Sequence, residues 1–140
     1  ADLLLMAAEC EVEVGSLTTA TNYVNMVRTR AANSADFVKN ATTNLPEATY
    51  VITNYPVFAD KATATAAIRH ERLIELAMEG HRFYDLVRWG IADPVLDAKI
   101  ARESAKRTHL AGASFDAPAD LYLPIPESVI SQSKGNLTQN

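Results

Sequence analysis

A stripe of three glutamates constrains the fold of this chain more than any other feature of its sequence. Glu71, Glu75 and Glu79 recur at every fourth position, so on a helix their carboxylates lie on one side. Like charges at this spacing repel by a few tenths of a kcal/mol per pair, so the fold must bring cations to them. Apolar residues form a wide arc away from the stripe, which predicts an interior helix from about Thr63 to Glu79. The arc contains Ala66, Ala67, Leu73, Ile74, Leu76, Ala77 and Met78, together with His70.

Gly80 marks the expected end of this helix. Were the helix to continue, Asp85 and Arg88 would fall within the apolar arc, where burying either charge alone costs several kcal/mol. We therefore predict a break at Gly80 and a second helix beyond it, from which Arg82 and Arg88 turn back toward the glutamate stripe. The core face of this second helix is expected to hold Phe83, Leu86 and Val87.

The polar residues around the break are interpreted as a structural network that locks two helices together. Segment 69–90 contains four arginines and four acidic residues, a balance that suits mutual pairing. A catalytic site needs groups with unequal pKa values instead. We expect His70 to be a hydrogen-bonded core histidine and Trp89 to be a core anchor whose N–H meets a carbonyl. The predicted network comprises His70, Glu71, Glu75, Glu79, Arg82, Asp85, Arg88 and Trp89.

No catalytic residue, metal site or cofactor is predicted, and the chain is not expected to be an enzyme. His70–Glu71 resembles the start of a zinc-protease motif, but the required second histidine falls at Ile74. A metal site made of His70, His81 and His109 is an alternative, although no pair has ligand spacing. A glycosidase that uses the glutamates is another alternative, although such acids usually come from separate elements on either side of a cleft.

A helical hairpin is predicted at the start of the chain, over residues 1–33. Apolar residues repeat at helical spacing as far as Gly15, and a second helix follows from about Thr18 to Ala32. The short Gly–Ser connection makes the pair antiparallel, so that it resembles one tetratricopeptide repeat unit. Because no repeat of fixed period follows, an array is not predicted. Cys10 lies in the apolar part of this hairpin and is expected to be a small buried thiol.

An irregular insert is predicted next, over residues 34–62. Asn, Thr, Ala and Pro accumulate there, and Pro46 and Pro56 discourage long helices. Four aromatic residues lie in this stretch. A loop of this length inside a compact domain is usually functional or covered by another part of the protein.

Residues 63–140 complete the predicted fold. After the glutamate-striped helix and its partner, a further helix is expected with Asp93 as its N-cap and Pro94 in its first position. The C-terminal part is predicted to be an extended tail with a turn of helix after Pro126. The chain is thus expected to be all-α and to form a single domain of hairpin, insert, packed helices and tail.

Charge and composition argue against several classes of function. The 140 residues carry a net charge of −4, and the thirteen basic residues are scattered without a run, which argues against nucleic-acid binding. One cysteine allows no internal disulfide. No stretch approaches the ~20 consecutive apolar residues of a membrane-spanning helix.

Three segments of the sequence resemble the SusD/RagB family. The first is IRHERLIELAMEGHRFYDLVRWG, at 68–90, which resembles the family signature. ADLLLMAAECEVEVG with ATNYVNMVRTRA resembles the late helical hairpin of the family, and LYLPIPESVISQSKGNLTQN resembles its C-terminal ending. Three motifs in the family's order are far more specific than any one of them.

The resemblance implies the C-terminal portion of a longer, surface-exposed lipoprotein of the Gram-negative outer membrane. The lipid anchor would lie outside this chain. Family members bind oligosaccharides or other nutrients without catalysis and deliver them to a TonB-dependent, SusC-like transporter. The alternative is a helical docking module that contacts the transporter without binding glycan itself.

The resemblance also affects where a ligand is expected. In the family the signature is largely scaffold, so the charged network is not expected to touch ligand. Aromatic rings on irregular backbone suit the apolar C–H face of a sugar, because a flat ring covers it at little entropic cost. Tyr50, Tyr55 and Phe58 are therefore the predicted ligand-binding residues, and the alternative is that they cap the local core.

Overall fold

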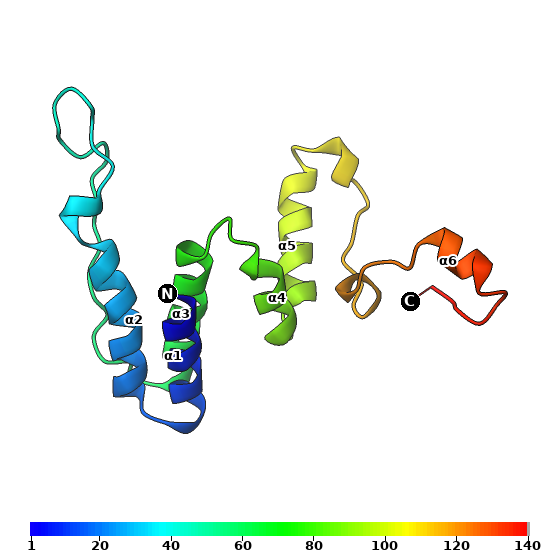
Figure 1. Cartoon of the computed structure of the whole chain (residues 1–140), viewed down its shortest axis with the longest axis horizontal. Helices are drawn as coiled ribbons and strands as arrows, with labels where there is room; N and C mark the ends of the chain where they lie inside the picture. The colour runs from blue at the N-terminus through cyan, green and yellow to red at the C-terminus, as the bar shows by residue number, and fades with distance from the viewer. Residues whose placement is uncertain (140) are drawn as a thin grey trace. The chain divides into compact units, whose positions relative to one another are not determined.

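The computed structural model describes residues 1–139 and confirms the all-α prediction. Within that range the chain forms six α-helices and three short 3-10 helices, and no β-strand (Figure 1). It divides into two compact units, Ala1–Arg82 and Phe83–Asn140. The single domain expected from the sequence stays a prediction.

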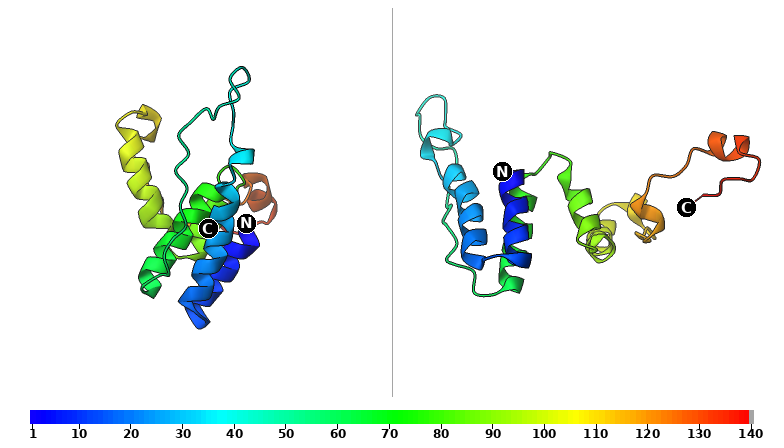
Figure 2. Two further views of the ribbon diagram at one scale, coloured as in Figure 1. Left: turned by 90° about the vertical axis from the view of Figure 1, so that its left-hand side faces the viewer. Right: turned by 60° about the horizontal axis from the view of Figure 1, so that its bottom comes forward.

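The first unit is built on the predicted helical hairpin. Helices α1 (Asp2–Val14) and α2 (Leu17–Ala31) run antiparallel, and α3 (Lys61–Glu75) lies beside both (Figures 1 and 2). Small apolar residues at helical spacing let the three helices approach closely. The core consists of Leu5, Ala8, Val12, Ala20, Val24, Val27, Phe58, Ala64 and Ile68.

Side chains mark the starts of α2 and α3. The hydroxyl of Ser16 accepts a hydrogen bond from the backbone N–H of Thr19, as an N-cap residue does. Helix α3 starts slightly before the predicted Thr63, and its N-cap is Asp60, whose carboxylate accepts from both the N–H and the hydroxyl of Thr63. These hydrogen bonds hold the pKa of the Asp60 carboxyl below its usual value.

The prediction that Cys10 is buried was wrong. The core face of α1 carries Leu5, Ala8 and Val12, and Cys10 falls on another face of the same helix. Its thiol is exposed. An alanine-rich sequence leaves the phase of the buried face ambiguous, and the contacts with α2 and α3 decide it.

The insert leaves the end of α2 and returns along its side (Figure 1). It begins with a 3-10 turn at Ser34–Asp36 and folds back at a single antiparallel bridge between Lys39 and Pro46. Its last part, residues 53–58, is extended and is here called the return segment. The return segment runs antiparallel to α2, since its successive residues bond to successively earlier residues of that helix.

Side chains of α2 take the place of a neighbouring strand for the return segment. The Asn25 amide donates to the carbonyl of Tyr55 at 2.9 Å and accepts from its N–H at 2.8 Å. The Thr21 hydroxyl accepts from the N–H of Phe58 at 3.1 Å and donates to the carbonyl of Leu17. Backbone groups that would otherwise be buried without partners are thereby satisfied.

Helix α3 buries a different face from the one predicted. Its buried residues are Ala64, Ile68, Glu71 and Arg72. Of the predicted apolar arc, only Leu76 is buried, whereas Leu73, Ile74 and Met78 are exposed. The helical wheel placed the charges outward, but the carboxylate and the guanidinium that face the hairpin find partners there, and this outweighs the preference for apolar burial.

A break before the helix that starts after Gly80 is confirmed, but the first helix ends four residues before the predicted Glu79. Helix α3 ends at Glu75, and Met78 and Gly80 both have left-handed backbone conformations, with φ of 68° and 82°. Helix α4 (His81–Arg88) then begins. Of its predicted core face only Leu86 is buried, while Val87 is half-buried and Phe83 is exposed.

The second unit continues through α5 (Ala92–Ser104), two 3-10 turns at Thr108–Leu110 and Ala119–Leu121, and α6 (Glu127–Gln132). The predicted turn of helix after Pro126 is confirmed. Helix α5 starts earlier than predicted, with Ile91 as its N-cap residue, so Asp93 is not the N-cap and Pro94 is the third helical residue. Proline is still tolerated there, because the first-turn N–H groups have no partner within the helix.

The pairing of Asn25 with the return segment can be tested by mutation. We expect Asn25→Ala to lower the free energy of unfolding by about 1–2 kcal/mol, because the N–H and C=O of Tyr55 lose their partners. Asn22→Ala, at an exposed position on the same helix, is the matched control and should change stability by less than about 0.5 kcal/mol. Urea unfolding followed by circular dichroism measures both, and equal effects would contradict the role given to Asn25.

Candidate functional site

A buried ion pair joins α2 to α3 and lies under the return segment. The Arg28 guanidinium donates to Oε1 of Glu71 at 2.6 Å, and the Tyr55 hydroxyl donates to the same oxygen at 3.0 Å. Only 3% of the Glu71 side chain is exposed. Arg28, Tyr55 and Glu71 are here called the charged joint, because each comes from a different segment of the first unit.

Arg28 makes two further contacts that complete the joint. Its Nε donates to the carbonyl of Thr53 at 2.5 Å, and its guanidinium lies 4.6 Å from the centre of the Tyr55 ring. The ring therefore receives a cation on its face and offers its hydroxyl to a carboxylate. Burial raises the pKa of the Tyr55 hydroxyl above its usual value, and the carboxylate of Glu71 adds to this.

The remaining glutamates of the stripe are more exposed and have other partners. Glu75 forms an ion pair with Arg30, whose side chain is 65% exposed. Glu79 approaches the imidazole of His81 at 3.9 Å. The stripe thus has a buried end at Glu71 and an exposed end at Glu79.

The expectation that the cations of the stripe follow Gly80 was wrong for Glu71 and Glu75. The guanidiniums on Glu71 and Glu75 come from α2 instead. Arg88 hydrogen-bonds to the buried carboxylate of Asp85 at 2.9 Å, one turn earlier in α4. Sequence spacing reveals partners within a helix, whereas partners on a helix 40 residues away depend on tertiary packing.

Two aromatic members of the predicted network also lie elsewhere than expected. His70 is exposed rather than a core histidine, since it lies on the face of α3 that the hairpin leaves uncovered. Trp89 is half-buried, with the Arg88 guanidinium 4.9 Å from its ring centre, rather than a fully buried anchor. Both therefore contribute less to the core than the sequence predicted.

A groove of about 300 Å³ opens beside the charged joint. Its polar lining includes His70 and the ion-paired carboxylates of Glu71 and Glu75, while its apolar lining comes from α2, the insert and α3. Both carboxylates are engaged with guanidiniums, so neither is set apart as a general acid. The lining residues are Val27, Arg28, Ala31, Val51, Ile52, His70, Glu71, Ile74 and Glu75.

The three predicted ligand-binding aromatics have different environments. Phe58 is 5% exposed and belongs to the core, so the alternative of capping the core describes it correctly. Tyr55 packs against it, with ring centres 5.6 Å apart, and is held in the charged joint. Tyr50 is half-buried in the outer part of the insert and stacks on Phe37, with ring centres 4.1 Å apart.

Two further findings concern metal binding and membrane-spanning helices. In the described part of the chain, no three His, Cys, Asp or Glu side chains gather where they could hold a metal ion. None of the helices of residues 1–139 combines the length and the apolar character needed to cross a bilayer.

The residues that the sequence analysis missed are those of α2 that face the insert. Asn25, Arg28 and Thr21 bind the return segment and α3, yet they read as ordinary polar residues of a helix. One signal was available, because Thr21, Asn25 and Arg28 recur at helical spacing beside the apolar positions Val24 and Val27. A polar row next to an apolar face is consistent with a helix that packs against backbone.

The structure defines an all-α scaffold whose helices enclose a charged joint, and comparison with known proteins gives its family. Residues 1–140 match the SusD family. The chain is 36% identical over 126 residues to the SusD-like protein P25 of Formosa agariphila. The aligned region covers 90% of this chain and 20% of that protein. It thus spans about a fifth of the length of that curated relative. The chain belongs to the SusD family, which confirms the resemblance seen in the sequence.

Removal of Arg28 should destabilise the fold. We expect Arg28→Ala to lower the free energy of unfolding by about 3 kcal/mol, because the buried carboxylate of Glu71 loses its counter-charge. Arg30→Ala removes the exposed guanidinium of the next pair and should cost no more than about 1 kcal/mol. Denaturant unfolding compares the two, and an effect of Arg30→Ala as large as that of Arg28→Ala would contradict the importance assigned to burial.

The raised pKa of Tyr55 predicts a pH dependence of stability. The folded state holds the Tyr55 proton more tightly than the unfolded state, so its contribution is complete below the unfolded pKa of about 10 and is lost as the pH rises through the folded pKa. The midpoint temperature of thermal unfolding should therefore fall less steeply above about pH 10 for Tyr55→Phe than for the unchanged chain. Tyr84→Phe, at an exposed position, is the control, and a parallel decline for Tyr55→Phe would rule out this linkage.

Proposed function

We propose that the protein captures oligosaccharide at the bacterial cell surface without catalysis. The observation that carries this proposal is membership of the SusD family across residues 1–140. The full-length protein would be held on the outer membrane by a lipid anchor. It would deliver its ligand, an oligosaccharide or another nutrient, to a TonB-dependent, SusC-like transporter.

The state of the glutamates supports a non-catalytic role. Glycoside hydrolysis needs one carboxyl group that donates a proton and a second that acts as nucleophile or base. Glu71 and Glu75 lie one turn apart on the same helix, and each is bound to an arginine. Their arrangement suits the stabilisation of a scaffold.

Within the insert, Tyr50 is the ligand contact that we propose. Stacking on Phe37 fixes the orientation of its ring before any ligand arrives, so binding costs little side-chain entropy. Tyr55 and Phe58 are assigned instead to holding the return segment, since their rings are engaged with the charged joint and the core. The ligand surface would thus lie on the outer part of the insert.

A second candidate is a docking module that contacts the transporter and does not bind glycan. The exposed apolar side chains of α3 favour it. Leu73 and Ile74, near the end of α3, are 42% and 50% exposed, and Met78 in the turn that follows is fully exposed. Apolar groups gathered on one exposed face are a common feature of protein interfaces.

Glycan affinity of the full-length protein and its variants tests these proposals. Tyr50→Ala should reduce retardation in gels that contain the bound polysaccharide, with affinity about tenfold lower for the loss of one stacked ring. Tyr122→Ala removes an exposed tyrosine outside the insert and should leave the affinity unchanged.

Three outcomes would count against the proposed function. Unchanged affinity of Tyr50→Ala would remove that residue from the ligand surface. Absence of binding to any polysaccharide, together with retained association with the transporter, would favour the docking module. Shortened products after incubation with glycan would show catalysis and overturn the non-catalytic role.

A further inference from the structure

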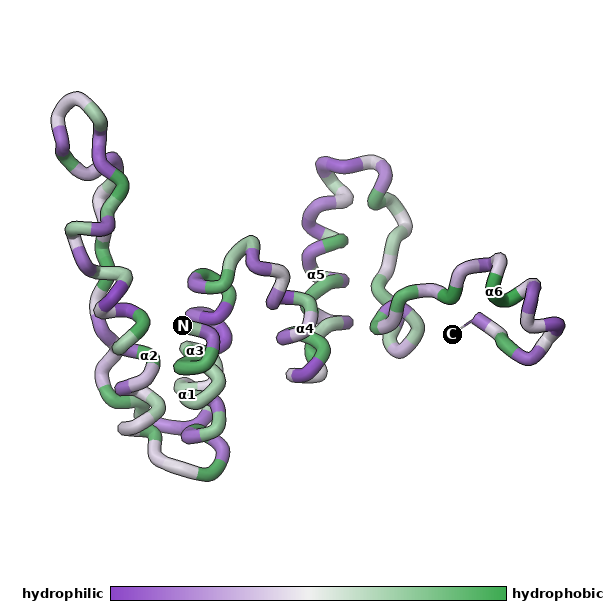
Figure 3. The backbone as a smooth tube through the Cα atoms, in the orientation of Figure 1, coloured by the Kyte–Doolittle hydropathy of each residue, from purple (hydrophilic) through white to green (hydrophobic). Residues whose placement is uncertain are grey.

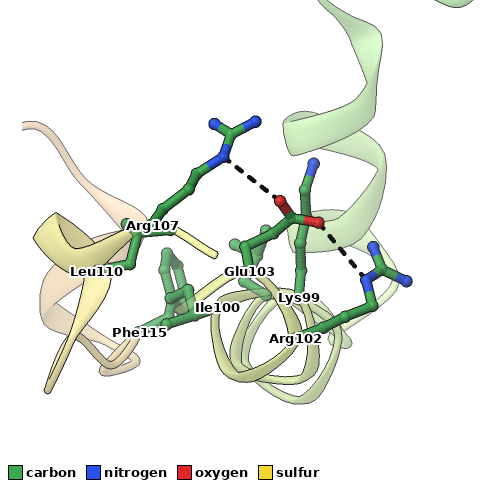
Figure 4. Close-up of a pocket in the computed structure, with 8 residues that line it drawn as sticks. Lys99, Ile100, Arg102, Glu103, Arg107, Leu110 and Phe115 are labelled. Atoms are coloured by element: carbon green, nitrogen blue, oxygen red, sulfur yellow. Dashed lines mark ion pairs between the residues drawn. The ribbon is translucent and has the colours of Figure 1, made fainter. Parts of the chain in front are cut away.

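The second unit contains a pocket of about 540 Å³ beside the C-terminal half of α5 (Figure 4). Pockets for small ligands and single sugar residues commonly have volumes of this order. It is formed by α5, by the turn at Thr108–Leu110 and by the loop that carries Phe115. All of these segments lie within one compact unit.

The floor of the pocket is apolar. Leu96 and Ile100 come from α5, Leu110 comes from the following turn, and Phe115 closes the floor. All four are half-buried, so their apolar surface is only partly used by the fold. The Phe115 position is fixed, because its N–H donates to the Asp97 carboxylate at 2.8 Å and its ring packs edge to face on Phe83.

The rim of the pocket is cationic. Lys99, Arg102 and Arg107 surround a single acid, Glu103, which lies 3.7 Å from Nε of Arg102 and 3.4 Å from Nε of Arg107 (Figure 4). The Nε groups of both arginines face Glu103, whereas their Nη groups donate no hydrogen bond to a described residue and are available to a ligand. Lys99 makes no ion pair within residues 1–139. The two arginine side chains are 72% and 62% exposed.

This charge is a local exception in an acidic chain. The whole chain has a net charge of −4, yet residues 99–107 contain four cations and one acid. Figure 3 shows this hydrophilic stretch at the C-terminal end of α5 and in the connection after it. Positions 99 and 102 are three residues apart on the helix, and the turn after Ser104 brings Arg107 to the same pocket. Three basic residues that lie within nine positions of the sequence therefore line one pocket.

We propose that this pocket binds an anionic sugar residue of an acidic glycan, carboxylated or sulfated. The apolar floor would take the C–H face of the ring, with Phe115 as its aromatic part. The arginines would receive the acidic group through paired N–H donors, and Lys99 would add a point charge. This inference rests on the proposed function, because an acidic peptide would satisfy the same charges.

Binding of three polymers to the full-length protein tests the proposal. Polygalacturonate supplies carboxylates, dextran sulfate supplies sulfates, and dextran is the neutral counterpart. We expect one or both acidic polymers to bind, with affinity that falls as salt is raised. Lys99→Ala combined with Arg102→Ala should weaken that binding about tenfold, whereas Lys106→Ala removes a nearby cation outside the pocket lining and should have much less effect.

Phe115→Ala distinguishes binding inside the pocket from binding to the surrounding positive charge alone. It leaves every charge in place and should still weaken binding several-fold, because the floor loses its ring. Lys99→Ala alone should weaken binding less than the double variant, and Lys99→Arg, which keeps the charge, should retain most of the affinity. Thermal unfolding of each variant identifies any loss that is due to misfolding, and the exposed rim variants are expected to unfold like the unchanged protein.

The outcomes distinguish this inference from the function on which it rests. Binding of dextran alone, unaffected by the rim variants, would overturn the pocket assignment and leave glycan capture intact. Equal weakening by Lys106→Ala would also overturn it. Competition by polyglutamate as strong as that by the acidic polymers would reassign the pocket to acidic peptide. Failure to bind any glycan would overturn both proposals.

Discussion

The fold of the first unit depends on one buried carboxylate. Glu71 accepts hydrogen bonds from Arg28 on α2 and from Tyr55 on the return segment, and its own backbone belongs to α3. Three segments far apart in sequence therefore meet at one oxygen atom. A buried pair of this kind adds less net stability than apolar packing of the same volume, but it penalises any packing that leaves the charge without its partner. We attribute the register of α3 against the hairpin to this constraint.

Much of the architecture followed from the sequence, and the failures have a common cause. The hairpin, the break at Gly80 and the late turn of helix after Pro126 are local features, set by helical periodicity and by glycine and proline. The phase of α3 is not local. A helical wheel assigns charged residues to solvent, and it cannot show that Arg28, 43 residues earlier, offers a partner for Glu71. The prediction that Cys10 is buried was wrong for the same reason, because several faces of an alanine-rich helix are equally able to pack.

The candidate sites also show that local features were predicted from the sequence and that features set by tertiary packing were not. The aromatic residues of the insert were found by composition, but only the structure separates Tyr50, stacked on Phe37, from Phe58 in the core. The basic-rimmed pocket of the second unit was missed because its cations are separated in sequence by apolar and small residues. Helical spacing and one turn gather them, while the family signature, which dominates the sequence, lies outside that pocket lining.

The way in which the return segment is fastened has a consequence for evolution. Asn25 and Thr21 bond to backbone atoms of Tyr55 and Phe58, so part of the attachment does not depend on which side chains the segment carries. The chain between the end of α2 and residue 53 is then a closed loop with both ends fixed. The entropic cost of closing such a loop rises only slowly with its length. Insertions, deletions and substitutions at its tip can therefore accumulate while the helices beneath keep their packing, and such changes need no prior gain of stability elsewhere.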